Sequence, residues 1–202
     1  AISMMILVER GQIRLLDKVK DIIPDFKGWE DEEGNETDIR IVDLMTHTSG
    51  LPPYAPVDDL KEKYGAPNPD GLIEYIATCP RDFKPKTGFQ YSCLNYIALQ
   101  RIIETISGQS LKAFAKENIF DVLGMTHTDY QPAGETLARV APTEKQEDDS
   151  VLTGVVHDPL ARIMNGGISG NAGVFSDVND ALIHIRRRRR RGKCRVWWRP
   201  HS

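Results

Sequence analysis

The sequences LMTHTSGLP at residues 44–52 and FQYSCLNY at residues 89–96 decide how the rest of the chain is interpreted. The second leads into the longest helical pattern in the chain, in which apolar residues recur every three or four positions. Ser92 is a helix-start signal before this pattern, and Gly108 is a stop signal after it. We therefore predict a helix from Cys93 to Ser107, with an apolar face formed by Tyr96, Leu99, Ile102, Ile103 and Ile106.

Shorter helices are predicted on both sides of this one. Apolar spacing and capping residues indicate helices over residues 1–10, 15–23, 38–45 (started by Thr37), 70–78, 110–117 and 177–185 (started by Ser176). Residues 29–37 and 46–69 show little periodicity and are predicted as loops. Alternating runs of Val, Ile and Thr are few. We expect a mostly α-helical chain with loops and at most small β pieces.

Charge is distributed unevenly along the chain. The formal net charge is −3, but residues 186–202 hold nine Lys and Arg and no acid, so residues 1–185 carry −12. This acidic body gives no electrostatic reason to expect nucleic-acid binding. Two interpretations of the basic tail stay open. It is either an arginine-rich arm for nucleic acid or an anionic membrane, or a non-native or disordered end, which we favour.

Metal and membrane motifs are not found in the sequence. Cys79, Cys93 and Cys194 form no Cys-x-x-Cys and no two histidines have His-x-x-x-His spacing, so no metal site or cofactor is predicted. No apolar run approaches the roughly 20 residues of a membrane-spanning helix. Residues 1–10 lack the features of a signal peptide, and the localisation stays unknown.

Four phrases in the same order and spacing resemble one family. They are residues 44–52, residues 89–96, IFDVLGMTHT at residues 119–128 and GVFSDVND at residues 173–180. They resemble the serine β-lactamase-like, penicillin-binding-protein-related group, which includes class C β-lactamases, esterases and D-aminopeptidases. The resemblance covers residues 1–185 as a partial domain and implies part of an α+β β-lactamase/transpeptidase-like fold. We expect the chain to be truncated at both ends, with the central sheet largely missing.

The resemblance also implies a chemistry with three elements. The family uses a Ser-x-x-Lys nucleophile motif, a Tyr-x-Asn loop and a Lys-Thr-Gly or His-x-Gly strand. Tyr91 matches the tyrosine that serves as general base, and Ser92 matches the middle residue. Cys93 stands where the family has an amide or a carboxylate, so a substrate contact through Ser92 and Cys93 is only weakly indicated. Asn95 is a possible surrogate amide, although the helix would rotate it away.

The other two elements are missing from this sequence. No serine has a lysine three positions later. Lys86-Thr87-Gly88 spells the third motif but comes before Tyr91, where the family has a turn, so we interpret it as that turn. We therefore expect that the intact protein hydrolyses an amide, β-lactam or ester through an acyl-enzyme, and that this chain alone is inactive. Its substrate would be a small acyl compound or a peptidoglycan-like peptide.

Alternatives to this function remain open. The scaffold could serve as a non-catalytic binding or interaction module, and apolar helix faces without their sheet could drive self-association. Three further patterns suggest chemistry: His47 near Ser49, the pair His157-Asp158, and the Cys93 thiol at a helix start. We favour a structural interpretation for all three.

Overall fold

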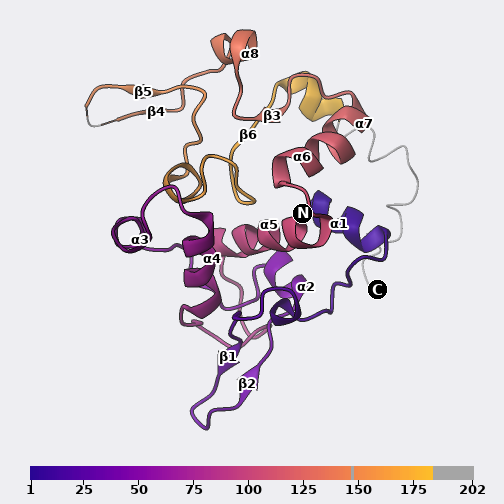
Figure 1. Cartoon of the computed structure of the whole chain (residues 1–202), viewed down its shortest axis with the longest axis vertical. Coiled ribbons are helices and arrows are strands. Elements are labelled where there is room, and N and C mark those ends of the chain that lie inside the picture. Colours follow the sequence, from indigo (N-terminus) through magenta and orange to yellow (C-terminus); the bar gives the residue numbers. More distant parts are fainter. Residues whose placement is uncertain (147, 184–202) are drawn as a thin grey trace.

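The computed structural model describes residues 1–146 and 148–183, and the basic tail at 186–202 lies outside the described residues. Helix α5, Cys93–Ser107, lies at the centre of the molecule (Figure 1). Its limits are those predicted, and Gly108 ends it in the left-handed conformation that favours glycine (φ 68°). Ser92 precedes the helix but does not cap it with its side chain, because the Ser92 hydroxyl donates to the carbonyl of Pro52 at 2.6 Å.

Four helices form the core together with α5. Helices α1 (Ile2–Glu9), α2 (Ile41–Met45) and α4 (Pro69–Thr78) pack directly against it, and α3 (Val57–Tyr64) packs against α4. Asn68 caps α4, since its side chain accepts a hydrogen bond from the Gly71 backbone N–H. These helices enclose the main core, whose fully buried members include Met4, Leu7, Leu44, Leu72, Ile76, Leu99 and Ile102.

A second group of short helices continues from the end of α5. Helix α6 (Leu111–Ala115) is capped by Ser110 as predicted and runs into a π-helix, η2 (Lys116–Phe120), and then α7 (Asp121–Leu123). A second π-helix, η3 (Leu160–Met164), packs against α3. Helix α8 (Gly134–Ala138) lies at the upper end, and residues 178–183 are helical. None of the described helices is long and apolar enough to span a bilayer.

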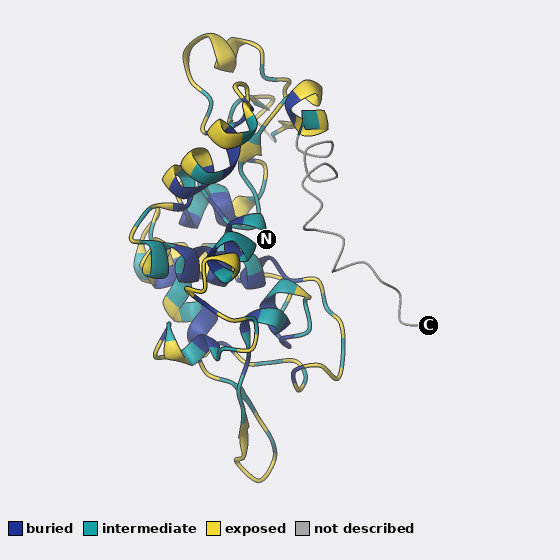
Figure 2. Cartoon of the chain, turned by 90° about the vertical axis from the view of Figure 1, so that its right-hand side faces the viewer, coloured by how far each residue is buried: buried dark blue, intermediate teal, exposed yellow. Residues whose placement is uncertain are grey.

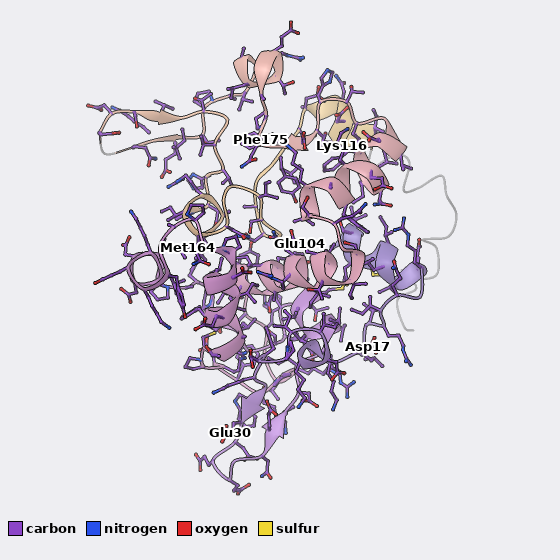
Figure 3. The ribbon with its side chains drawn as sticks, viewed as in Figure 1. Asp17, Glu30, Glu104, Lys116, Met164 and Phe175 are labelled. Carbon is purple, nitrogen blue, oxygen red and sulfur yellow. The ribbon has the colours of Figure 1, made fainter. Side chains whose placement is uncertain are left out.

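The β-structure in the described part of the chain consists of antiparallel pairs of two-residue strands. They are β1 (Trp29–Glu30) with β2 (Glu36–Thr37), β3 (Asp129–Tyr130) with β6 (Val174–Phe175), and β4 (Glu144–Lys145) with β5 (Val151–Leu152). Figure 3 shows Glu30 at the lower end, Glu104 on α5 in the middle and Phe175 in the upper part. The predicted fold class, mostly helical with small β pieces and no large sheet among the described residues, is confirmed.

Four local predictions are wrong. Residues 15–23 form only a 3-10 turn, η1 (Val19–Asp21), because their backbone pairs with residues 39–42, as in the 2.9 Å bonds from Val19 N to Ile39 O and from Val42 N to Leu15 O. The same pairing delays the next helix to Ile41, so Thr37 lies in β2 and does not cap it. The predicted loop at 46–69 contains α3, and the loop at 29–37 forms the β1–β2 pair.

Burial differs between the middle and the two ends of the molecule. Figure 2 shows the buried residues gathered on the central helices, while the β1–β2 turn and α8 are exposed. The upper part, which carries β3, β6 and α8, borders a cleft that is described below.

Candidate active site

A cleft of about 710 Å³ lies beside the N-terminal end of α5. Tyr91 and Cys93 line one wall, together with Tyr54 from the loop after α2. The remaining walls come from His127 and from three segments, at residues 136–143, 155–158 and 171–177. The structure thus brings the predicted Tyr91 and Cys93 into one cleft, and it adds residues that the sequence analysis did not single out.

Tyr91 is held at the cleft by the loop at residues 44–52. The Gln90 backbone N–H donates to the carbonyl of His47 at 3.0 Å, and the Ser92 N–H donates to His47 Nδ1 at 3.3 Å. The rings of His47 and Tyr91 lie 4.8 Å apart, centroid to centroid. The Tyr91 side chain is 56% exposed, so its phenol is open to the cleft while its backbone is fixed. The phrases at residues 44–52 and 89–96 therefore meet at the Tyr91 turn.

His47 is a positioning residue in this arrangement. Its Nδ1 accepts the Ser92 N–H and lies 3.1 Å from Asn95 Nδ2, so in the neutral ring the proton sits on Nε2. Burial lowers the pKa of His47 below 6.5, which favours this neutral form. His47 also has a positive φ of 58°, a backbone conformation that few non-glycine residues adopt.

Ser49 and Asn95 are buried behind His47 and do not reach the cleft. The Ser49 hydroxyl donates to Asn95 Oδ1 at 2.6 Å, and both side chains are almost completely buried. A Ser49 nucleophile activated by His47 is therefore not supported, and the structural interpretation of this pair is the one that the geometry favours. Asn95 is also turned away from the cleft, as expected from its place on the helix.

Cys93 is a buried thiol at the base of the cleft. Its side chain is 5% exposed, and its Sγ lies 4.0 Å from Asp158 Oδ2. Burial raises the pKa of Cys93, and the nearby Asp158 carboxylate acts in the same direction, while hydrogen bonds from Asn171 and Tyr91 oppose it. The thiol is therefore protonated at neutral pH and lacks the thiolate character of a reactive cysteine.

The pKa of Tyr91 is raised above its usual value. The largest cause is the negative charge that Cys93 carries once it ionises at alkaline pH, followed by burial and by a hydrogen bond to Cys93. A phenol that acts as a base near neutral pH needs cations that lower its pKa. The charges of Tyr54 and Asp158 also raise the pKa of Tyr91, so its phenol is protonated at neutral pH.

Ser92 occupies the predicted place in the motif but does not face the cleft. It has no exposed surface, and its hydroxyl donates a hydrogen bond to the Pro52 carbonyl.

Lys86-Thr87-Gly88 forms a turn, as predicted. The Lys86 N–H donates to the Thr48 carbonyl at 2.8 Å, and the Thr87 hydroxyl donates to the Lys84 carbonyl at 2.7 Å. This turn holds the 44–52 loop and lines no part of the cleft.

His157 and Asp158 both line the cleft but point to different partners. His157 Nδ1 lies 3.2 Å from a carboxylate oxygen of Glu144, and Asp158 Oδ1 accepts the Ala161 N–H at 2.8 Å. They do not form an acid/base pair with each other.

Asn171 is a residue of the cleft that was not predicted. It places an amide beside Cys93, and its Oδ1 accepts a hydrogen bond from the Ser169 hydroxyl at 2.6 Å. Its only sequence signal is the glycine-dense stretch at residues 166–173.

Comparison with known proteins identifies the family. The sequence matches the family described as Beta-lactamase over residues 1–193. The chain belongs to the Beta-lactamase family. This confirms the resemblance inferred from the four phrases.

Curated relatives of this Beta-lactamase-family chain are about twice its length. A protein of Salmonella agona described as a putative D-alanyl-D-alanine carboxypeptidase is 31% identical over 194 residues, which cover 88% of this chain and 45% of the relative. An N-acetylmuramyl-L-alanine amidase of Bacillus subtilis is 30% identical over 197 residues, covering 88% and 44%. The chain thus spans less than half the length of these relatives.

Solved structures show the same fold over most of the chain. FmtA from Staphylococcus aureus superposes with a TM-score of 0.70 at 22% identity, covering 92% of this chain and 48% of that one. A beta-lactamase/D-alanine carboxypeptidase from Yersinia pestis gives 0.68 at 21% identity, covering 91% and 48%. The described residues therefore form part of a β-lactamase/transpeptidase fold.

Proposed function

We propose that this chain forms the tyrosine wall of a serine hydrolase site for peptides that end in D-alanyl-D-alanine or carry a related acyl group. The observation that carries the proposal is the exposed Tyr91 phenol, fixed by His47 on the wall of a cleft of about 710 Å³. Support comes from the Beta-lactamase family match and from relatives named as carboxypeptidase and amidase.

The cleft geometry and the family resemblance together support a role for each of these residues. Tyr91 would move the proton between the attacking hydroxyl and the leaving group in the intact protein. The Asn171 amide, next to Cys93, would contact the substrate where the family motif places an amide, and Ser92 would act only by holding the turn. The relatives' activities belong to proteins about twice as long, so the chemistry of the whole protein is part of the proposal.

Turnover by this chain alone is not expected. None of its serines is followed three residues later by lysine, and the described surroundings of Tyr91 raise its pKa. A serine hydroxyl without a base is a poor nucleophile at neutral pH. These same observations favour a second candidate, a binding module that holds a peptide in the cleft and does not cleave it.

The test combines binding and turnover. We expect an N-acylated peptide ending in D-alanyl-D-alanine to bind the purified chain in calorimetry, and we expect Tyr91→Phe to weaken binding by about three- to tenfold through loss of one hydrogen bond. Tyr64→Phe is the matched control, because Tyr64 lies on α3 and does not line the cleft. Absence of binding, or equal weakening by both variants, would overturn the assignment of the cleft.

Turnover separates the two candidates. Nitrocefin and p-nitrophenyl acetate should not be hydrolysed above the rate of buffer. Hydrolysis that survives Tyr91→Phe would contradict the role of Tyr91. Hydrolysis that Tyr91→Phe abolishes would support that role and contradict the binding module.

A further inference from the structure

A row of hydrogen-bonded polar side chains runs from the middle of α5 to the cleft. It starts at Gln100 and passes through Asn165 and Ser169. It ends at Asn171, which lines the cleft beside Cys93. Gln100, Asn165 and Ser169 are buried, with exposed fractions of 7%, 6% and 1%, and none of them lines the cleft. An effect of these three residues on a ligand must therefore pass through Asn171.

The direction of each hydrogen bond in this row follows from a backbone donor at its start. The Gly170 N–H can only donate, and it bonds to Gln100 Oε1 at 2.9 Å. Gln100 Oε1 is therefore an acceptor, and it also accepts from Asn165 Nδ2 at 2.9 Å. Asn165 Nδ2 donates its other proton to Ser169 Oγ at 2.8 Å. The single proton of the Ser169 hydroxyl then goes to Asn171 Oδ1, at 2.6 Å.

Asn171 is fixed by this row as a hydrogen-bond donor toward the cleft. Its oxygen is held by Ser169, so its two N–H groups are on the opposite side of the amide. Burial raises the pKa of Cys93 most strongly, and the hydrogen bond from Asn171 acts against it, as a donor to the sulfur does. A flipped Asn171 amide would turn its oxygen toward Cys93 and leave the Ser169 proton without this acceptor.

Helix α5 sets the place of Asn171 as well as its direction. Cys93 and Gln100 are seven positions apart, so they lie on the same face of the helix. The segment that carries Asn171 packs against this face. Gly170 lies so close to α5 that a Cβ atom would overlap the carbonyl oxygen of Tyr96, and only glycine allows this approach. The backbone before Asn171 is therefore fixed relative to the start of α5.

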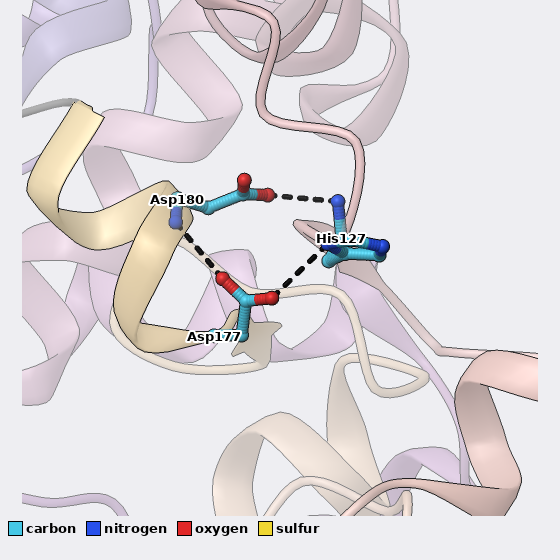
Figure 4. A group of neighbouring side chains, drawn as sticks. All are labelled: His127, Asp177 and Asp180. Atoms are coloured by element: carbon cyan, nitrogen blue, oxygen red, sulfur yellow. Dashed lines mark hydrogen bonds and ion pairs between the residues drawn. The ribbon is translucent and has the colours of Figure 1, made fainter.

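The same segment is also held beyond Asn171. Strand β6 pairs with β3, and the chain then reaches the polar contacts shown in Figure 4. Asp177 Oδ1 accepts the Asp180 N–H at 2.9 Å, and Asp180 Oδ2 accepts the His127 N–H at 2.7 Å. Asn171 thus lies between two anchored stretches of backbone, and the direction of its amide depends on its side-chain contacts.

We propose that Gln100, Asn165 and Ser169 are positioning residues that make Asn171 a hydrogen-bond donor to a carbonyl oxygen of the ligand. The inference rests on the proposed function, because it assigns the kind of peptide atom that lies against Asn171. The amide or acyl carbonyl of such a peptide supplies the acceptor. A ligand N–H at the same point would meet a second donor and be disfavoured. The row therefore gives the cleft a preference for an acceptor beside Tyr91.

A double-mutant cycle tests whether Ser169 acts through Asn171. We expect Ser169→Ala and Asn171→Ala each to weaken binding of the N-acylated peptide ending in D-alanyl-D-alanine by about three- to tenfold in calorimetry. The double variant should bind no more weakly than Asn171→Ala alone, because the Ser169 hydroxyl has no effect once the amide is removed. No loss in the single variants, or losses that multiply in the double variant, would overturn the proposal.

Ser107→Ala is the matched control for the loss of a serine hydroxyl. The Ser107 hydroxyl donates to the Ile103 carbonyl at 2.7 Å at the other end of α5, and Ser107 does not line the cleft. Peptide binding should be unchanged in this variant. A loss equal to that of Ser169→Ala would show that any weakened serine contact disturbs the cleft, and it would overturn the positioning role.

NMR of the full chain measures the amide direction without any ligand. The side-chain N–H signals of Asn171 are identified by their loss in Asn171→Asp. We expect nuclear Overhauser effects between these N–H groups and the Cβ protons of Cys93 in the unchanged chain and in Ser107→Ala, and their loss in Ser169→Ala. Asn165→Asp is a second variant with the same expected loss, because its carboxylate can accept the Ser169 proton in place of Asn171 Oδ1.

The two measurements separate the inference from the proposed function. Backbone amide spectra show whether each variant is folded. In folded variants, Overhauser effects that persist in both Ser169→Ala and Asn165→Asp, or that are absent from the unchanged chain, would overturn the inference. A peptide that fails to bind the unchanged chain would overturn the proposed function, and the Overhauser effects would then still decide the direction of the Asn171 amide.

Discussion

The region around α5 and the region above the cleft are built in different ways. Around α5 the helices share an apolar core in which most large side chains are fully buried. Above the cleft, β3–β6 and β4–β5 are two-residue pairs tied by polar contacts such as those of Asp180 and Glu144. The family phrases contribute to both regions, but Tyr91 lies in the region around α5. The tyrosine wall is held by hydrogen bonds to the 44–52 loop beside a packed apolar core, whereas the opposite wall is held by short polar contacts alone.

The largest effect on stability is expected from a cavity in the core of the region around α5. Ile102 has no exposed surface, so Ile102→Ala should destabilise the chain by about 2–5 kcal/mol in urea unfolding. Val151 on β5 is 49% exposed, and Val151→Ala should change stability by less than about 0.5 kcal/mol. Similar losses for the two variants would remove the distinction between the regions.

A smaller effect is expected at the contact behind His47. Ser49→Ala leaves the buried Asn95 Oδ1 without its donor, which should cost about 1–3 kcal/mol in urea unfolding. Ser150→Ala removes an exposed hydrogen bond to Asp148 and is the control, with an expected change below about 0.5 kcal/mol. If Ser49→Ala is as mild as its control, the polar support of the Tyr91 turn is unimportant.

His47 should make the stability of the chain depend on pH in the acid range. Burial lowers the pKa of His47 in the folded state. Below pH 6.5 the imidazole is therefore protonated more readily in the unfolded state than in the folded state. Stability should be complete above pH 6.5 and fall as the pH drops from there toward the folded-state pKa, with a slope of at most about 1.4 kcal/mol per pH unit. His47→Asn should flatten this slope in urea unfolding measured from pH 7 to 5. An unchanged slope would show that His47 is not the group responsible.

The smallest effect is expected from Tyr91 itself. Its side chain is 56% exposed and its phenol is not needed for packing, so Tyr91→Phe should change stability by less than about 0.5 kcal/mol. A loss above 1 kcal/mol in urea unfolding would mean that the phenol supports the fold, which would weaken the case for a functional role.

The comparison also explains which features the sequence could predict. Helix α5 was predictable residue by residue, because its apolar spacing is long and Gly108 ends it. Residues 15–23 have a helical pattern, but backbone pairing with residues 39–42 overrides it. Helix α3 was missed since only Leu60 of its eight residues is buried, which leaves a weak pattern.

The candidate site was predictable mainly on the tyrosine wall. Tyr91 and Cys93 stand in a phrase whose chemistry the family resemblance names. His127, Asp177 and Asp180 also stand in two of the four phrases, but about 50 residues separate His127 from the two aspartates, so the sequence does not show that they meet. Asn171 stands in none of the phrases and reaches the cleft only through folding. The position of Tyr91 also depends on His47, which the sequence suggested only as a partner of Ser49.

The most direct test of the central claim is a map of where a peptide binds. Backbone amide NMR of the chain, titrated with an N-acylated peptide ending in D-alanyl-D-alanine, reports each residue separately. We predict that the largest shifts fall on the cleft around Tyr91, Cys93 and Asn171, and that Tyr91→Phe reduces them while Tyr64→Phe does not. Shifts confined to other surfaces, or none at saturating peptide, would contradict the assignment of this cleft as the substrate site.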